Sequence, residues 1–128
     1  MAPKTHKIVW TDSAALDLAE IVRFIATDAP TNARRLLSKI RTGAAGLVRF
    51  PDRGRVVPEL AVHGVVVFRE LLLRPYRIIY RVHERDVNVL AVMDGRRDVE
   101  DLLLERLTCR QTEFKGYDVG EHGPRKKK

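Results

Sequence analysis

The sequence has little that could form a disulfide, bind a metal ion or cross a membrane. Cys109 is its only cysteine, so no internal disulfide is possible, and the four histidines are scattered along the 128 residues. The first ten residues contain no apolar stretch typical of a signal peptide, and no apolar run approaches membrane-spanning length. We therefore expect a cytoplasmic protein with no cofactor, no metal ion and no contact with a membrane.

Aromatic residues are also scarce, at 6% of the chain. A surface that stacks bases would need several of them in exposed positions. Tyr76 and Tyr80 fall on the side of a strand that we assign to the core, and Trp10 ends a short β-rich run. We interpret all three as core residues rather than as base-stacking residues.

Acidic residues are outnumbered, and the imbalance is uneven. The formal net charge is +7, and residues 110–128 hold six Lys or Arg against three acids. Residues 1–109 then hold 18 against 14, which makes the body only mildly basic. This distribution favours acidic or polyanionic partners in general. It also divides the chain into a domain at 1–109 and a basic, flexible tail at 110–128 that has little to bury.

Hydrophobic spacing predicts the secondary structure. Apolar residues recur at helical spacing over 12–27 and again from 31 or 32 to 48, and Pro30 separates the two helices. β-rich runs occupy 7–10, 65–73, 76–83 and 87–93, and 99–107 resembles a short helix. The order is β-α-α-β-β-β plus a C-terminal helix, an α+β fold with an antiparallel sheet packed on a two-helix hairpin. Nothing in this order covers the second face of the sheet.

Several arginines fall on or near this second face. Arg77 and Arg81 alternate with apolar residues in one strand, and Arg96 and Arg97 follow the next strand. One interpretation is a solvated face on which these arginines pair with Glu70 or with other nearby acids. The other, which we favour for the group, is a binding surface for an acidic partner or target. Its members are Arg69, Arg77, Arg81, Arg96 and Arg97.

The motifs in this order resemble those of the RelE/ParE superfamily of toxins from bacterial type II toxin–antitoxin systems. KIVWTDSAALDLAEIVRFIA is similar to the first strand and helix, and FPDRGRVVPEL to the crossover. VFRELLLRPYRIIYRV resembles the central hairpin, and VNVLAVMDGRRD the closing strand with its arginine motif. The resemblance covers about residues 7–107, and the hairpin with the GRRD segment is its most specific part.

The resemblance implies a toxin that a cognate acidic antitoxin holds inactive. ParE-like members bind DNA gyrase and trap its cleaved-DNA intermediate, and they carry out no chemistry of their own. The segments PDRGR, PEL, YRIIYRV and GRRD are closer to this branch. We therefore expect a gyrase-binding toxin that is not an enzyme. A homodimer and a toxin–antitoxin heterotetramer are both compatible with the sequence.

The alternative is a RelE-like endoribonuclease that cuts messenger RNA on the ribosome without metal. Arg77 and Arg97 occupy the positions of that branch's phosphate-binding arginines, and Glu70 completes the set that we would assign to a nuclease. The lysines and the tyrosine of that branch are missing. Some RNA-cleaving relatives use a glutamate, an arginine and a C-terminal histidine instead, and residues of this chain could take those roles. The candidates are Glu59, Glu70, His83, Tyr117 and His122. A toxin fold without toxicity is a third hypothesis.

Overall fold

The computed structural model describes residues 6–95 and 98–109. The predictions for Arg96 and Arg97, and for the tail at 110–128, lie outside the described residues.

The N-terminal strand leads directly into the first helix. Strand β1 spans Lys7–Trp10 and helix α1 spans Asp12–Asp28. The side-chain oxygen of Thr11 accepts a hydrogen bond from the Ala14 amide at 3.2 Å, which satisfies one of the free amides at the helix start. The Thr11 hydroxyl also donates to the Val89 carbonyl at 2.9 Å. The predicted helix start is confirmed, and the same side chain ties it to the sheet.

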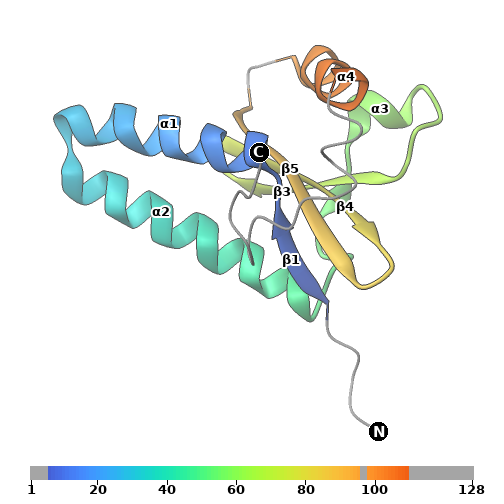
Figure 1. The fold of residues 1–128 in the computed structure, drawn as a ribbon, viewed down its shortest axis with the longest axis horizontal. Coiled ribbons are helices and arrows are strands. Elements are labelled where there is room, and N and C mark those ends of the chain that lie inside the picture. The colour runs from blue at the N-terminus through green and yellow to red at the C-terminus, as the bar shows by residue number, and fades with distance from the viewer. Residues whose placement is uncertain (1–5, 96–97, 110–128) are drawn as a thin grey trace, which may run out of the picture.

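The second helix packs antiparallel to the first. Helix α2 spans Pro30–Ala45, and its proline lies in the first turn, where a missing amide hydrogen costs nothing. A 3-10 turn, η1, continues it over Gly46–Val48. Only Ala29 separates α1 from α2, and the resulting hairpin extends well beyond the sheet (Figure 1). The predicted helix pair is therefore confirmed.

The sheet has five strands in the order β1-β5-β4-β3-β2. The later strands are β2 (Arg55–Val56), β3 (Phe68–Leu73), β4 (Tyr76–His83) and β5 (Asp86–Asp94). The β3–β4–β5 meander is antiparallel as predicted, whereas β1 pairs with β5 in parallel. The α+β class and the element order are confirmed, and the crossover adds β2 and a short helix, α3 (Pro58–Ala61), that the sequence did not predict.

The helix hairpin covers one face of the sheet. Ile78 and Tyr80 of β4 are fully buried in one cluster with Leu18 of α1 and Ile40 of α2. Val82 is partly buried against the same cluster. The face predicted for the helix pair is therefore the face on which it packs.

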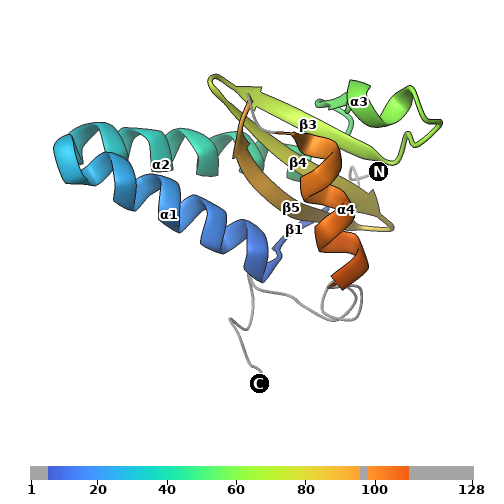
Figure 2. The same ribbon diagram turned by 90° about the horizontal axis from the view of Figure 1, so that it is seen from above.

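The second face of the sheet is also covered, and our expectation of an open face was wrong. Helix α4 spans Val99–Cys109 and lies with α3 on the side away from the hairpin (Figures 1 and 2). A second apolar cluster joins these helices to the sheet through Val57, Phe68, Ile79, Leu90, Ala91, Met93, Val99, Leu102 and Leu103. The pairing of β4 with β5 shifts register between Ile79 and Tyr80. Leu90 is the extra residue in β5, and it joins its neighbour Ala91 in this second cluster, whereas Val89 belongs to the first.

An ion pair attaches α4 to α1. Arg106 donates to both carboxylate oxygens of Asp17, at 2.7 and 2.8 Å, and to the Leu90 carbonyl at 2.9 Å. Asp17 also accepts the Val92 amide at 2.9 Å. These side chains hydrogen-bond β5 beyond the point where β1 ends, and they hold α4 over the sheet.

The crossover before α3 is anchored on a buried tyrosine. The Tyr80 hydroxyl donates to the Pro51 carbonyl at 2.7 Å and accepts the Gly54 amide at 2.9 Å. A Cβ at Gly54 would come within 2.5 Å of the Glu70 carbonyl oxygen and 2.6 Å of the Tyr80 hydroxyl. Only glycine allows the chain to pass this close to the sheet.

We expect Gly54→Ala to lower the free energy of unfolding by about 1–3 kcal/mol, because backbone and tyrosine must both move to admit the methyl group. Gly43→Ala is the control. Its Cβ would meet only the flexible ends of Leu73 and Leu71, at 3.0 and 3.2 Å, and alanine gains about 1 kcal/mol over glycine in a helix. Urea unfolding of both variants measures the difference. Equal stabilities would contradict the close approach at Gly54.

Candidate functional site

The predicted arginine surface is divided between the two faces of the sheet. Arg69 stands opposite Tyr80 and therefore faces the helix hairpin. Arg77 stands opposite Leu72 and Met93, and it faces α3 and α4. Arg81 shares that second face. The three arginines therefore do not form one surface.

Arg77 is the centre of a buried charge network. Its Nε donates to Glu70, and its two terminal nitrogens donate to the two oxygens of Glu59 at 2.8 and 2.7 Å. The second oxygen of Glu70 accepts from the Arg55 Nε at 2.6 Å. The Arg77 side chain is 8% exposed and that of Glu70 is not exposed at all. The predicted pairing of Arg77 with Glu70 is confirmed, but the pair is buried instead of lying on a solvated face, because Glu59 of α3 also binds the guanidinium. Whether Arg77 contacts a partner stays a prediction.

The network shifts two ionisation equilibria. The hydrogen bond to Glu59, reinforced by Glu70, raises the pKa of Arg77 above its usual value, although burial acts in the opposite direction. The hydrogen bond from Arg77 holds the pKa of Glu59 below its usual value. Two carboxylates against Arg77 and Arg55 leave the network with no net charge. It cannot act as a cationic site.

The remaining predicted arginines have different roles. Arg69 donates to the Gly54 carbonyl at 2.7 Å and lies 3.8 Å from Asp52, so it holds the crossover. Arg81 is half-buried and has no ion pair within the described part of the chain. Neither result tests whether these residues also contact a partner, which stays a prediction.

A shallow cavity of about 620 Å³ lies beside the network. Its basic lining comes from Arg55, Arg74 and Arg77, and Asp94 supplies an opposing carboxylate. Leu72, Pro75, Tyr76 and Gly95 complete the wall. Arg55 and Arg77 both donate hydrogen bonds to Glu70, whereas Arg74 has no ion pair among the described residues. Arg74 is therefore the cation of this cavity that remains available to a ligand.

A second concentration of charge, on α2 and just after η1, was not predicted from the sequence. Residues 29–51 contain five Lys or Arg and no acid. All five are exposed and have no ion pair within residues 6–95 and 98–109: Arg34, Arg35, Lys39, Arg41 and Arg49. The signal was present in the sequence as a long stretch without acids, but helical periodicity was used only to locate the buried side of α2.

The described residues offer no group of three or more His, Cys, Asp or Glu side chains placed to hold a metal ion. Within the same residues, no helix is both long and apolar enough to cross a membrane.

Comparison with known proteins adds a consistent set of similarities. The family described as "ParE toxin of type II toxin-antitoxin system, parDE" matches residues 8–99. Toxin RelE2 of Caulobacter vibrioides is 30% identical over 92 residues, which cover 71% of this chain and 97% of that protein. A relative from Sinorhizobium fredii is 34% identical over 99 residues, covering 76% of this chain and 96% of its own.

A solved structure shares the fold. The chain described as "Chromosomal ParDE TA system from P. aeruginosa" superposes with a TM-score of 0.59 at 22% identity. The match covers 71% of this chain and 97% of that one.

We expect Arg77→Met to destabilise the protein by about 3–5 kcal/mol, because Glu70 would keep a buried charge without its main partner. Arg81→Met is the matched control, since it removes the same charge from a side chain on the same face with no described ion pair. Chemical denaturation measures both. Equal unfolding free energies would contradict the structural role of Arg77. Loss of toxicity in an Arg77 variant is interpretable only after this measurement.

The depressed pKa of Glu59 also predicts how stability depends on pH. A carboxyl whose pKa is lower in the folded state stabilises the fold above its unfolded pKa, here near 4.5, and this contribution disappears as the pH falls through the lower, folded value. Glu59→Gln removes the titrating group. We expect the melting temperature of the wild type to exceed that of the variant at pH 7, and the difference to shrink below about pH 4.5. Parallel curves from pH 7 to 3 would refute this account.

Proposed function

The chain belongs to the ParE toxin family of type II toxin–antitoxin systems, and on that premise we propose that it arrests growth by binding DNA gyrase. In this proposal the toxin traps gyrase on cleaved DNA and blocks replication. A cognate antitoxin holds it inactive. The toxin acts by contact alone and needs neither a metal ion nor a cofactor.

The observation that best supports this proposal is that the side chain of Arg77 is buried and ion-paired. Cleavage of RNA by its own 2′-hydroxyl requires cationic groups that can reach the crowded phosphate. Arg77, at the position of a phosphate-binding arginine in the RNA-cleaving branch, already donates to two carboxylates and is nearly inaccessible. Exposing it to a phosphate would leave Glu70 buried without compensation. This arrangement supports a toxin that binds a protein over one that cuts RNA.

One observation favours a second candidate, a ribosome-dependent endoribonuclease. Glu59 is 41% exposed and hydrogen-bonded to Arg77, so a carboxylate and a guanidinium meet at the protein surface. Such a pair could take a proton from the attacking hydroxyl and steady the phosphate. The lowered pKa of Glu59, however, makes it a weak base, whereas an efficient general base has a pKa near 7.

Pulse labelling after induction of the toxin alone in a bacterium tests the proposal. We expect thymidine incorporation to fall within minutes while methionine incorporation continues. Replication depends directly on gyrase, whereas loss of gyrase affects translation only later. The same strain expressing the cognate antitoxin should show neither effect. A prior loss of methionine incorporation, together with messenger RNA cut on purified ribosomes, would refute gyrase as the target and favour the nuclease.

A further inference from the structure

A groove with an acidic lining lies between α1 and the edge of the sheet, and we call it the α1–β5 groove. It has a volume of about 270 Å³. The edge of β5 is open there because β1 ends at Trp10, opposite Val89, and the described elements supply no other strand beside it. The lining consists of Asp17, Glu20, Ile21, Phe24, Tyr76, Val92, Met93 and Asp94.

Two lining residues of α1 are exposed side by side. Glu20 has no ion pair among the residues that the structure describes. Phe24 is 80% exposed, an unusual state for a phenyl ring. The two residues are four positions apart, so their side chains are neighbours on one stripe of the helix. A carboxylate beside an exposed ring fits a segment that offers one basic and one apolar side chain.

The chain brings its own C-terminal tail, residues 110–128, to this groove. Arg106 of α4 donates to both carboxylate oxygens of Asp17, which is itself a lining residue. Helix α4 ends three residues later, at Cys109, and the tail begins there. The starting point of the tail is therefore fixed next to one end of the groove.

The length of the tail is sufficient to follow the groove. Asp17 and Phe24 are seven residues apart, which is about 10 Å along the helix axis. Lys115 comes six residues after Cys109, and six extended residues span about 20 Å. The segment around Lys115 can therefore lie beside the exposed part of α1, with the rest of the tail still to follow.

The residues of the tail match the groove in charge and in spacing. The tail holds six Lys or Arg against three acids. Alternate side chains of an extended chain point the same way, about 6.6 Å apart, and residues four apart on a helix have Cβ atoms about 5–6 Å apart. Lys115 and Tyr117 therefore match Glu20 and Phe24 in order as well as in spacing.

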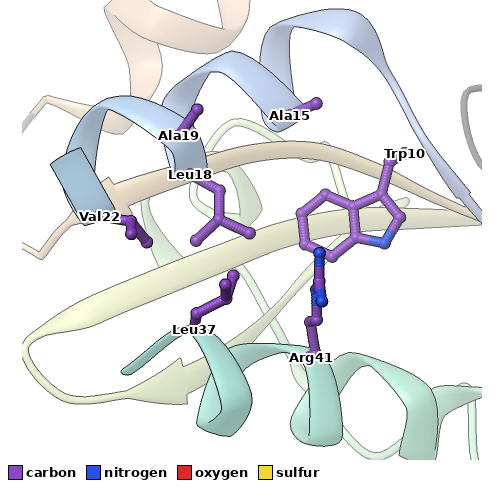
Figure 3. Close-up of a pocket in the computed structure, with 7 residues that line it drawn as sticks. All are labelled: Trp10, Ala15, Leu18, Ala19, Val22, Leu37 and Arg41. Atoms are coloured by element: carbon purple, nitrogen blue, oxygen red, sulfur yellow. The ribbon is translucent and has the colours of Figure 1, made fainter. Parts of the chain in front are cut away.

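The other cleft of the hairpin has the opposite charge. It has a volume of about 460 Å³ and lies between α1 and α2 (Figure 3). Arg41 supplies the charge in its lining, and the side chain points toward the indole of Trp10 (Figure 3). A basic segment is repelled from this cleft and attracted to the α1–β5 groove.

We propose that the C-terminal tail binds back onto the α1–β5 groove of its own chain. The ammonium group of Lys115 pairs with Glu20, and the ring of Tyr117 packs on Phe24. Because the tail is attached beside the groove, its effective concentration is high, and a contact too weak to hold a separate peptide is sufficient. The bound tail shields an exposed phenyl ring from water. The inference is independent of gyrase as the target.

Paramagnetic relaxation in the full-length chain tests where the tail binds. A nitroxide is attached through Gly120→Cys, in a chain whose native thiol is removed by Cys109→Ser. We expect the amide signals of Glu20 and Phe24 to lose intensity. The signal of Glu84, in the β4–β5 turn at the opposite end of the sheet, should keep its intensity. Reduction of the nitroxide gives the reference spectrum.

A pair of charge reversals measures the contribution of Glu20. Glu20→Lys should lower the ratio of bound to free tail about threefold or more, because a repulsion replaces an ion pair. Glu84→Lys makes the same change at an exposed residue far from the groove, and it should leave the ratio nearly unchanged.

A pair of apolar substitutions measures the contribution of the ring. Phe24→Ser should lower the same ratio about tenfold, because the apolar contact is lost. Phe50→Ser is the control, since this ring is 64% exposed and lies outside the groove. All four positions are exposed, and the dispersion of the amide spectrum reports directly that each variant is folded.

Three results would overturn the proposal. The first is full intensity along α1 in the labelled chain. The second is an equal effect of each variant and its control, which would mean that the tail is held by general attraction alone. The third is intensity loss on α1 that appears only when labelled chains are mixed with isotope-enriched unlabelled chains, which would place the tail on a second copy. None of these measurements involves growth, so the outcome of pulse labelling does not affect them.

Discussion

A carboxylate without access to water must be balanced by nearby cations, and Glu70 imposes this condition in the middle of the sheet. Arg77 meets it from β4 and Arg55 from β2. Arg77 in turn binds Glu59 at the start of α3. One buried charge therefore determines where the crossover lies and how the short α3 sits on the sheet. The second apolar cluster includes Val57 and Leu60, which flank Glu59 in the crossover.

Because Arg77 has a structural role, it is not available to bind a partner in the way that an exposed arginine would be. The sheet arginines split between two faces, and the innermost of them is neutralised. Four of the cations without an ion pair within the described residues lie instead on α2. Arg41 lines an apolar cleft between α1 and α2, whereas Asp17 and Glu20 of α1 line a different groove. Charge in this protein is thus divided between a buried structural network and exposed cations, a difference that composition alone cannot show.

Most of the fold could be predicted because it depends on local patterns. The α1–α2 hairpin and the β3–β4–β5 meander appeared from hydrophobic spacing and short connections, close to their observed bounds. The coverage of the second face could not be predicted in this way. Alternation within β4 predicts which side chains share a face, but it does not predict which elements pack against that face. The register shift in β5, which places the adjacent Leu90 and Ala91 in the same cluster, also cannot be read from a regular alternation.

The sequence by itself determined the α+β class, the family and the excess of basic residues, because periodicity, motif order and composition are properties of the chain alone. Only the tertiary structure decided which arginines are available to a partner. Arg77 and Glu70 are seven residues apart and Arg77 and Glu59 eighteen, and their contacts exist only once β3, α3 and β4 have come together. Whether a charge is neutralised or exposed depends on its neighbours in space, and for Arg77 these come from the adjacent strand of the hairpin and from the short helix of the crossover.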